Sequence, residues 1–162
     1  MKMLISFQER FITRRFVFFI QIGDFLSDLE KLIELSKTWE KENITNGYIA
    51  NTEKDILEPL VVAIEKKKII GYCFGEFYTE KSTFSYIKPG SKCFRISEIY
   101  VLPKYRDKGV GETLIKMIQD EVKNKCEYTV LSTSTKDYQK ILRFYCEKAD
   151  MDFHSAFLIK KN

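Results

Sequence analysis

A glycine-bearing segment follows a strand-like apolar stretch and precedes an amphipathic helical pattern. It reads Arg106-Asp107-Lys108-Gly109-Val110-Gly111. Because glycine has no side chain, a ligand can approach the backbone closely at Gly109 and Gly111. The first turn of the next helix offers unpaired N–H groups and the positive end of the helix dipole, which together bind phosphate. Arg106 and Lys108 add positive charge. The segment therefore predicts a phosphate or pyrophosphate site.

The spacing of this segment, R-x-x-G-x-G, separates it from better-known nucleotide motifs. It is neither the GxGxxG of dinucleotide-binding folds nor the GxxxxGK[ST] of P-loop proteins, so NAD and ATP lose support. Taken alone, the spacing is a weak signal, and a plain glycine-rich turn is the alternative. The strand before it and the helix after it favour the ligand site.

Two motifs of this chain resemble motifs of the GCN5-related N-acetyltransferase (GNAT) superfamily, and they occur in the same order. The acetyl-CoA motif of that superfamily, [QR]-x-x-G-x-[GA] after a strand, is matched by residues 106–111. A later family stretch, A-x-x-F-Y-E-K-x-G-F, is similar to residues 141–151, which read ILRFYCEKADM. Asp150 stands where the family usually has Gly, and Tyr138 falls near a common cofactor-contacting Asn. The order of elements matches over residues 13–160.

The resemblance implies acetyl-CoA as co-substrate and no metal. It implies that the cofactor lies in a cleft between two splayed parallel strands, those of Glu98 and Tyr128. The pantetheine arm would bond to the backbone of Ile99, Tyr100 and Val101. The pyrophosphate would lie on the amides of Arg106, Asp107, Lys108, Gly109, Val110, Gly111, Glu112 and Thr113.

Two side chains carry the chemistry that the resemblance implies, which is direct attack of an amine on the thioester. An alkylammonium must lose a proton before it attacks, and Glu98 is the candidate base, directly or through water. Tyr145 falls on the family position that protonates the leaving thiolate, and an ordinary Tyr stays protonated at neutral pH. The alternatives are a solvated strand carboxylate for Glu98 and a core tyrosine for Tyr145.

The acceptor is indicated by charge alone. Residues 24–58 hold nine acidic residues and four lysines, whereas the whole chain carries +4. This balance suits a cationic primary amine on a small molecule or a peptide, and a solvated helix face is the alternative. Trp39, Tyr48, Glu76 and Tyr78 are candidate lining residues.

The elements that must position these residues form a mixed α/β pattern. Strands are expected at 13–22, 60–64, 69–78, 93–102, 128–131 and 153–160, and helices at 26–39, 52–57, 109–123 and 137–148. With the resemblance, this order predicts a central mixed sheet of about six to seven strands flanked by about four helices. We expect one domain over 1–162, with 1–12 as a loose N-terminal arm.

Composition limits the remaining classes. No apolar run approaches the roughly 20 residues of a membrane span, so no membrane and a cytoplasmic location are expected. The four cysteines are widely spaced and join a single histidine, which indicates reduced thiols rather than a metal site. The modest net charge disfavours nucleic acid, although the basic N-terminal arm keeps a nucleic-acid binder as one hypothesis. A second alternative hypothesis is a CoA-binding module that has lost its catalytic activity. The possibility of a homodimer is also left open.

Overall fold

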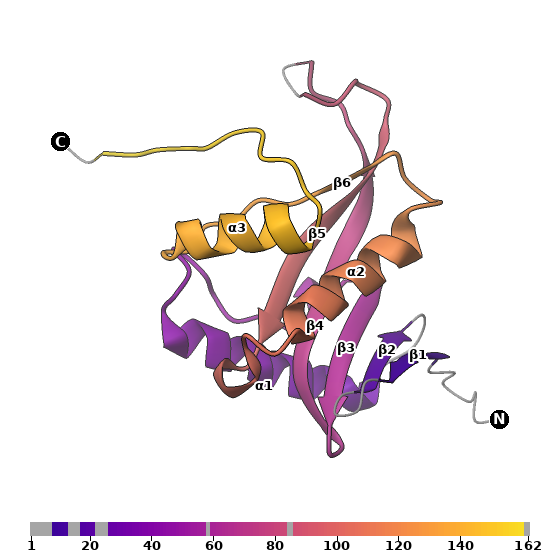
Figure 1. Cartoon of the computed structure of the whole chain (residues 1–162), viewed down its shortest axis with the longest axis vertical. Helices are drawn as coiled ribbons and strands as arrows, with labels where there is room; N and C mark the ends of the chain where they lie inside the picture. Colours follow the sequence, from indigo (N-terminus) through magenta and orange to yellow (C-terminus); the bar gives the residue numbers. More distant parts are fainter. Residues whose placement is uncertain (1–7, 13–16, 22–25, 58, 84–85, 161–162) are drawn as a thin grey trace.

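One mixed sheet organises the part of the chain that the computed structural model describes, residues 8–12, 17–21, 26–57, 59–83 and 86–160. Its strand order is β1-β2-β3-β4-β5-β6 (Figure 1). The strands are β1 (Gln8–Ile12), β2 (Val17–Gln21), β3 (Leu60–Glu65), β4 (Lys68–Thr79), β5 (Lys92–Val101) and β6 (Tyr128–Val130). The helices are α1 (Leu26–Glu42), α2 (Val110–Val122) and α3 (Tyr138–Lys148), with two 3-10 turns, η1 (Glu53–Asp55) and η2 (Pro103–Tyr105).

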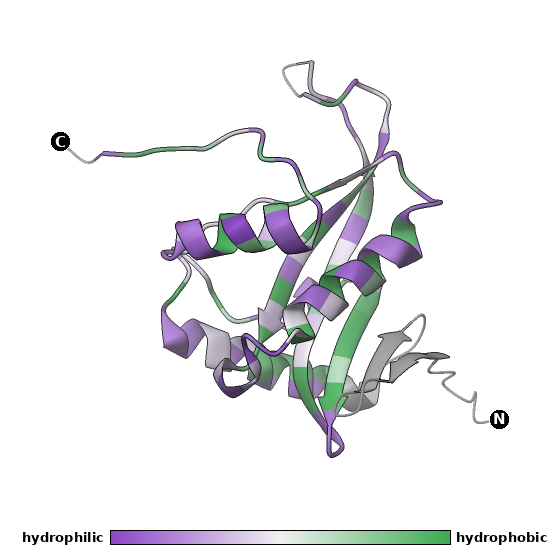
Figure 2. Cartoon of the chain, viewed as in Figure 1, coloured by the Kyte–Doolittle hydropathy of each residue, from purple (hydrophilic) through white to green (hydrophobic). Residues whose placement is uncertain are grey.

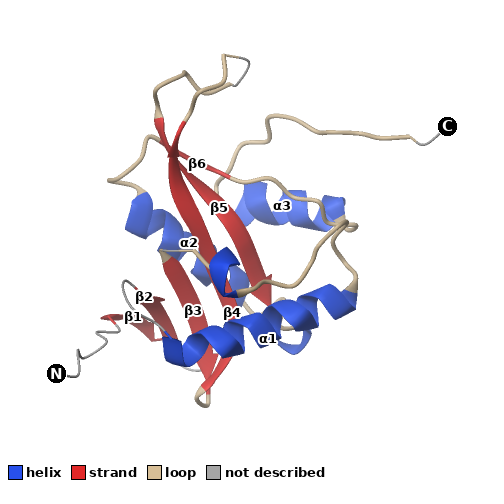
Figure 3. Cartoon of the chain, turned by 180° about the vertical axis from the view of Figure 1, so that it is seen from behind, coloured by secondary structure: helices blue, strands red, loops and turns tan. Residues whose placement is uncertain are grey.

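Helices cover both faces of this sheet. α2 and α3 lie on one face (Figure 1), and α1 crosses the other (Figure 3). Strands β1 to β5 pair antiparallel with their neighbours, whereas β6 runs parallel to β5. The parallel pair places the end of β5 next to the connection from β6 to α3, so the site lies where the two strands part.

Strand β3 shows that the sheet lies between two hydrophobic cores. Its run Leu60-Val61-Val62-Ala63 is buried on both sides. Leu60 and Val62 pack in the α1 cluster, while Val61 and Ala63 pack in the α2 cluster. A continuous apolar run of this kind is typical of a strand with both faces covered, and Figure 2 shows β3 as strongly hydrophobic.

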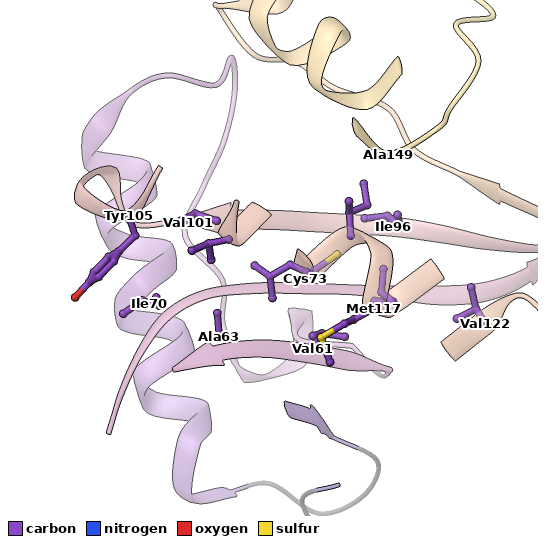
Figure 4. Packing of buried hydrophobic residues seen from close by; sticks show 14 of the residues in the cluster. Val61, Ala63, Ile70, Cys73, Ile96, Val101, Tyr105, Met117, Val122 and Ala149 are labelled. Atoms are coloured by element: carbon purple, nitrogen blue, oxygen red, sulfur yellow. The ribbon is translucent and has the colours of Figure 1, made fainter. Parts of the chain in front are cut away.

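The α2 cluster is the larger core and extends to the predicted site. Figure 4 shows Val61, Ala63 and Cys73 of the sheet in the same cluster as Met117 of α2. Val101 and Tyr105, at the end of β5 and in η2, belong to it as well. The core therefore holds both ends of the predicted phosphate turn, the strand before it and the helix after it.

The mixed α/β fold is confirmed, and the observed elements differ from the expected ones in detail. Three α-helices are present in the described residues rather than about four, because the helix expected at 52–57 is only the 3-10 turn η1. The strand expected at 13–22 is β2, and residues 13–16 and 22 lie outside the described residues. The arm expected at 1–12 contains β1, which pairs with β2, while residues 1–7 also lie outside the described residues.

The closing strand expected at 153–160 is wrong. Residues 151–160 have no regular structure, and Phe157, Leu158 and Ile159 are almost fully exposed. An apolar run favours a strand only where a neighbouring strand pairs with its backbone groups. This segment leads away from the sheet after α3 (Figure 1), and it has no ladder partner in the described residues.

Two further expectations concern the cysteines and a membrane span. All four cysteines are free thiols, as the sequence predicted, and Cys73 and Cys93 are buried. Among the described helices, none is at once long enough and apolar enough to cross a bilayer.

Candidate active site

A β-bulge in β5 decides which way the catalytic candidate points. Phe74 of β4 pairs with Glu98, but Gly75 pairs with Ile96, so Ser97 is an extra residue. Before the bulge, Ile96 packs in the α2 cluster. After it, Ile99 and Val101 pack there instead, and Glu98 turns to the α1 face. A bulge shifts the alternation of a strand by one residue and re-aims its side chains.

Gly75 makes this bulge sterically possible. A Cβ on Gly75 would lie 2.1 Å from the carbonyl oxygen of Arg95 and 2.7 Å from Cζ of Phe94. Only a residue without a side chain fits so close to a neighbouring backbone. The sequence signal for the bulge is therefore a glycine inside a strand, not a feature of β5 itself.

Glu98 is half-buried and accepts hydrogen bonds from three side chains. The hydroxyl of Tyr72 and the side-chain amide of Asn51 each donate to Oε2 over 2.8 Å, and the Tyr48 hydroxyl donates over 3.3 Å. All three end on the same oxygen. Within the described residues, Oε1 receives no donor, so it is the oxygen that can accept a proton from a substrate.

One donor to Glu98, Asn51, is itself held by α1. The backbone N–H of Asn51 donates to Oγ of the buried Ser36 over 2.9 Å, and that hydroxyl donates to the carbonyl of Ile33. The segment between α1 and β3 is thereby fixed across the end of the sheet. Neither Asn51 nor Tyr72 was predicted as a site residue, and no motif in the sequence marks them.

Burial raises the pKa of Glu98 above that of an ordinary glutamate. The hydrogen bonds from Asn51, Tyr72 and Tyr48 oppose the rise, and the negative charge of Asp55 adds to it. A carboxylate with a raised pKa is a stronger base than a solvated one, because it holds a proton more tightly. Burial first, and then the charge of Glu98, raise the pKa of Tyr72 as well, so this tyrosine remains a donor.

The parallel ladder between β5 and β6 is short. It joins Cys93 to Tyr128, Phe94 to Thr129 and Arg95 to Val130, and it ends there. β5 continues to Val101 paired with β4 alone, while the chain after β6 leaves it toward α3 (Figures 1 and 3). In the described residues no strand pairs with this edge of β5 beyond Arg95. Backbone groups of Ile99, Tyr100 and Val101 that point to this edge are therefore open to an extended ligand, except the Val101 carbonyl, which accepts from Nε of Arg106.

The turn after β5 forms a cradle of backbone amides. Every N–H from Asp107 to Glu112 lacks a hydrogen-bond acceptor among the described residues. Asp107 and Gly109 have positive φ angles of 56° and 79°, and Lys108 between them does not. Alternation of this kind gathers successive N–H groups into an anion-binding concavity. The dipole of α2 points its positive end at the same place. The turn fits a phosphate group.

The two ends of the expected pyrophosphate segment are already occupied. The N–H of Arg106 donates to the carbonyl of Pro103 over 3.1 Å, and that of Thr113 donates to the carbonyl of Gly109 over 3.0 Å. These bonds belong to η2 and to the first turn of α2. The amides that remain open run between them, and they include Lys108, Val110 and Gly111.

The charges around the cradle are largely paired. The guanidinium of Arg106 bonds to Glu42 rather than pointing into the turn, and the Lys108 ammonium donates to the carbonyl of Lys104. Asp107 pairs with Lys140, and Glu112 pairs with Lys116. The sequence predicted that positive side chains would add to the binding of an anion here. In the structure, the cradle offers an anion mainly backbone amides.

Gly111 faces α3. A Cβ built on it would lie 3.5 Å from Cζ of Phe144 and 3.9 Å from Cγ2 of Val101, which are ordinary contacts. The protein itself therefore tolerates alanine at this position. Among the described residues, no contact around Gly111 requires a glycine at this position.

Tyr145 lies on the opposite face of the sheet from Glu98. It packs against the α2 cluster, as Ile99 does, and its ring meets Phe144 edge-on at 5.3 Å between centroids. Burial, with a smaller contribution from Cys73, raises its pKa, so it stays protonated. Its hydroxyl has no hydrogen-bond partner among the described residues and is free to donate. No contact joins it to Glu98 among the described residues, because the two side chains lie on opposite faces of the sheet.

The candidate lining residues of the acceptor divide into two groups. Trp39 stacks on Tyr48 with centroids 4.0 Å apart, and the Tyr48 hydroxyl donates to Glu98. Glu76 pairs with Arg95, whose guanidinium lies over the ring of Tyr78. This second group lies farther along β4 and β5, on the other side of the bulge. The described residues hold no cluster of three or more metal-ligating side chains.

Comparison with known proteins places this geometry in a family. The family model described as Acetyltransferase (GNAT) family matches residues 26–151, which include the bulge, the cradle and α3. No curated protein sequence matches. Many solved structures do, among them three acetyltransferases that differ in their acceptors.

The solved structures share the fold at low sequence identity. An aminoglycoside acetyltransferase from an uncultured soil metagenomic sample is 16% identical with a TM-score of 0.64, covering 91% of this chain and 96% of that one. A ribosomal-protein-alanine N-acetyltransferase from Brucella melitensis is 15% identical with a TM-score of 0.62, covering 91% and 100%. A glucosamine-6-phosphate N-acetyltransferase from Arabidopsis thaliana is 20% identical with a TM-score of 0.60, covering 89% and 97%.

The strand order, the amide cradle at the start of α2 and the matched segment agree with one another. The chain belongs to the GNAT family of acetyltransferases.

Proposed function

We propose that this protein transfers an acetyl group from acetyl-CoA to a primary amine. The observation that carries the proposal is the position of Glu98. It is a half-buried carboxylate with a raised pKa and one open oxygen, placed just where the β5–β6 ladder has ended. Its three hydrogen bonds, all to Oε2, offset part of the cost of burying a carboxylate and leave Oε1 open to a ligand.

The cofactor would be held by backbone groups. The open amides of the turn, from Asp107 to Glu112, would bind the pyrophosphate, and the β5 edge at Ile99, Tyr100 and Val101 would bind the pantetheine arm. When bound, acetyl-CoA supplies a thioester, whose carbonyl carbon accepts a nucleophile and whose sulfur leaves. Gly111 would let that ligand approach the first turn of α2.

Glu98 would take the proton of the amine. The attacking nitrogen forms the new N–C bond, its proton passes to Oε1 directly or through a water, and the C–S bond breaks. Backbone N–H groups at the β5 edge would stabilise the negative charge that develops on the carbonyl oxygen. Tyr145, on the opposite face, would donate its hydroxyl proton to the departing sulfur and be reprotonated from solvent.

The acceptor would enter from the α1 face. That face carries Glu98 with Tyr48 and Trp39, and residues 24–58 are acidic overall. This supports a cationic amine, on a small molecule or a peptide. Two of the similar structures are an aminoglycoside acetyltransferase and a glucosamine-6-phosphate N-acetyltransferase, so amino sugars are a reasonable first class to test.

The test is a thiol-release assay with acetyl-CoA across a panel of amines: polyamines, aminoglycosides, amino sugars and peptides with free N-termini or lysines. We expect amine-dependent release of CoA thiol with at least one cationic amine. Binding of acetyl-CoA without thiol release for any amine class would favour the alternative, a CoA-binding module. Failure to bind CoA at all would overturn the cofactor assignment.

A further inference from the structure

Arg106 and Glu42 form a two-point ion pair between the cradle and α1. Nη1 of Arg106 lies 2.8 Å from Oε2 of Glu42, and Nη2 donates to Oε1 over 2.9 Å. Glu42 is the last residue of α1, and Arg106 opens the turn that carries the free amides. The side chains are 32% and 17% exposed, so the pair is shielded from water more than a surface ion pair.

The same guanidinium also holds β5. Its Nε donates to the carbonyl of Val101 over 2.9 Å, and its carbon lies 5.6 Å from the ring centroid of Tyr100. The Tyr100 hydroxyl in turn donates to Oε1 of Glu42 over 2.5 Å. Arg106 thus joins three elements, and only the planar fork of arginine can make these contacts together.

Aromatic contacts continue from this pair to the catalytic candidate. Trp39 stacks on Tyr100 at 5.2 Å and on Tyr48 at 4.0 Å between centroids, and the Tyr48 hydroxyl donates to Glu98. A contiguous set of contacts therefore leads from the turn to Glu98. We call these residues the α1 relay: Arg106, Glu42, Tyr100, Trp39 and Tyr48.

We propose that the Arg106–Glu42 pair is a positioning device that couples cofactor binding at the turn to the geometry of Glu98 and the acceptor side. This inference rests on the proposed function. Occupancy of the cradle would fix the turn, and the relay would carry that ordering to Tyr48. Arg106 and Glu42 would then influence the reaction through other residues, without touching the reacting atoms. Coupling of two binding sites is reciprocal, so the acceptor would also strengthen cofactor binding.

The sequence provides a built-in reporter for this coupling. Trp39 is the only tryptophan of the chain, and it lies in the middle of the relay. Its fluorescence, excited at the red edge of tryptophan absorption, should change when CoA is added to the full-length protein. The change should follow the same binding curve as calorimetry with CoA.

Three variants test the relay at separate points. Glu42→Gln removes the charge of the pair, Arg106→Lys removes the fork, and Tyr100→Phe removes one hydrogen bond but keeps the ring. At saturating CoA, we expect each variant to lose most of the fluorescence change while calorimetry still detects binding. The matched control is Arg95→Lys, which alters an exposed Arg–Glu pair on the same strand and should keep the full response.

The outcomes separate the coupling from the proposed function. If the wild type binds CoA without any change at Trp39, or if variants that bind CoA retain the full change, the coupling is overturned. If the wild type does not bind CoA by calorimetry, the proposed function itself is overturned. Circular dichroism of each variant confirms that a lost signal is not a lost fold, and Tyr100→Phe, the mildest change, serves if the ion-pair variants unfold.

Discussion

Ile96 and Glu98 are two residues apart on β5, yet their side chains lie on opposite faces of the sheet. The extra residue Ser97 reverses the alternation between them, and Gly75 on β4 leaves room for the close backbone approach. A regular strand would place Glu98 in the apolar α2 cluster beside Ile96. The bulge therefore places on the α1 face a carboxylate that would otherwise destabilise the α2 cluster.

This relationship predicts that Gly75→Ala is strongly destabilising. The new Cβ would lie 2.1 Å from a backbone oxygen, and the strands can relieve this only by moving apart. We expect a loss of about 3 kcal/mol or more in the free energy of unfolding, measured by chemical denaturation. Gly111→Ala is the control, since its Cβ meets only ordinary contacts; equal stability losses in the two variants would contradict this description of the bulge.

The cradle predicts that Gly111 governs CoA affinity. A ligand that binds only the folded protein raises its melting temperature, so the thermal shift with CoA measures binding. Gly111→Leu should abolish the shift by blocking approach to the first turn of α2. Gly111→Ala, which the protein accommodates, should fold normally and bind CoA more weakly than the wild type. A full CoA shift in the leucine variant would show that the ligand does not approach this turn.

The backbone at the end of α3 supports a further prediction. Asp150 has a φ angle of 52°, a left-handed conformation that glycine, the family's usual residue at this position, adopts easily. Its carboxylate makes no hydrogen bond or ion pair in the described residues. Asp150→Gly should therefore be neutral or stabilising by up to about 1 kcal/mol, since glycine adopts this conformation without strain but costs more entropy on folding. A clear loss of stability in a thermal melt would reveal a contact of the Asp150 side chain.

The position of Tyr145 predicts a selective kinetic effect. In Tyr145→Phe the ring still packs against the α2 cluster, but the hydroxyl that would protonate the thiolate is gone. We expect kcat to fall by about 10²-fold or more while CoA affinity stays close to that of the wild type. Steady-state kinetics and CoA titration measure the two quantities. Unchanged kcat would make Tyr145 a core residue only.

Much of the cofactor side was predictable from the sequence, because it depends on local spacing. A strand, a glycine-bearing turn and an amphipathic helix lie next to one another in the chain, and their geometry follows from helix ends and glycine conformations. The side chain of Arg106 is the exception. Its fork bonds to Glu42, a residue 64 positions away, and no local pattern indicates that pairing.

The acceptor side was less predictable, because it is assembled from distant segments. Asn51 and Tyr72 reach Glu98 only after α1, β4 and β5 have packed. Residues 153–160 show that a local pattern can also predict an element that does not form. They hold the apolar run Ala156-Phe157-Leu158-Ile159, but strand formation depends on a neighbouring edge that the segment itself does not encode.

If Glu98 accepts the proton of the attacking amine, the pH dependence of kcat/KM must differ between the wild type and Glu98→Gln, measured with an identified acceptor. Burial raises the pKa of Glu98, so the wild-type rate should fall as the pH drops through that raised value and the carboxylate becomes protonated. The glutamine variant should lose about 10²–10⁴-fold near neutral pH and recover as the pH rises, because more of the amine is already uncharged. A glutamine variant that turns over at the wild-type rate, with the same pH profile, would contradict the account.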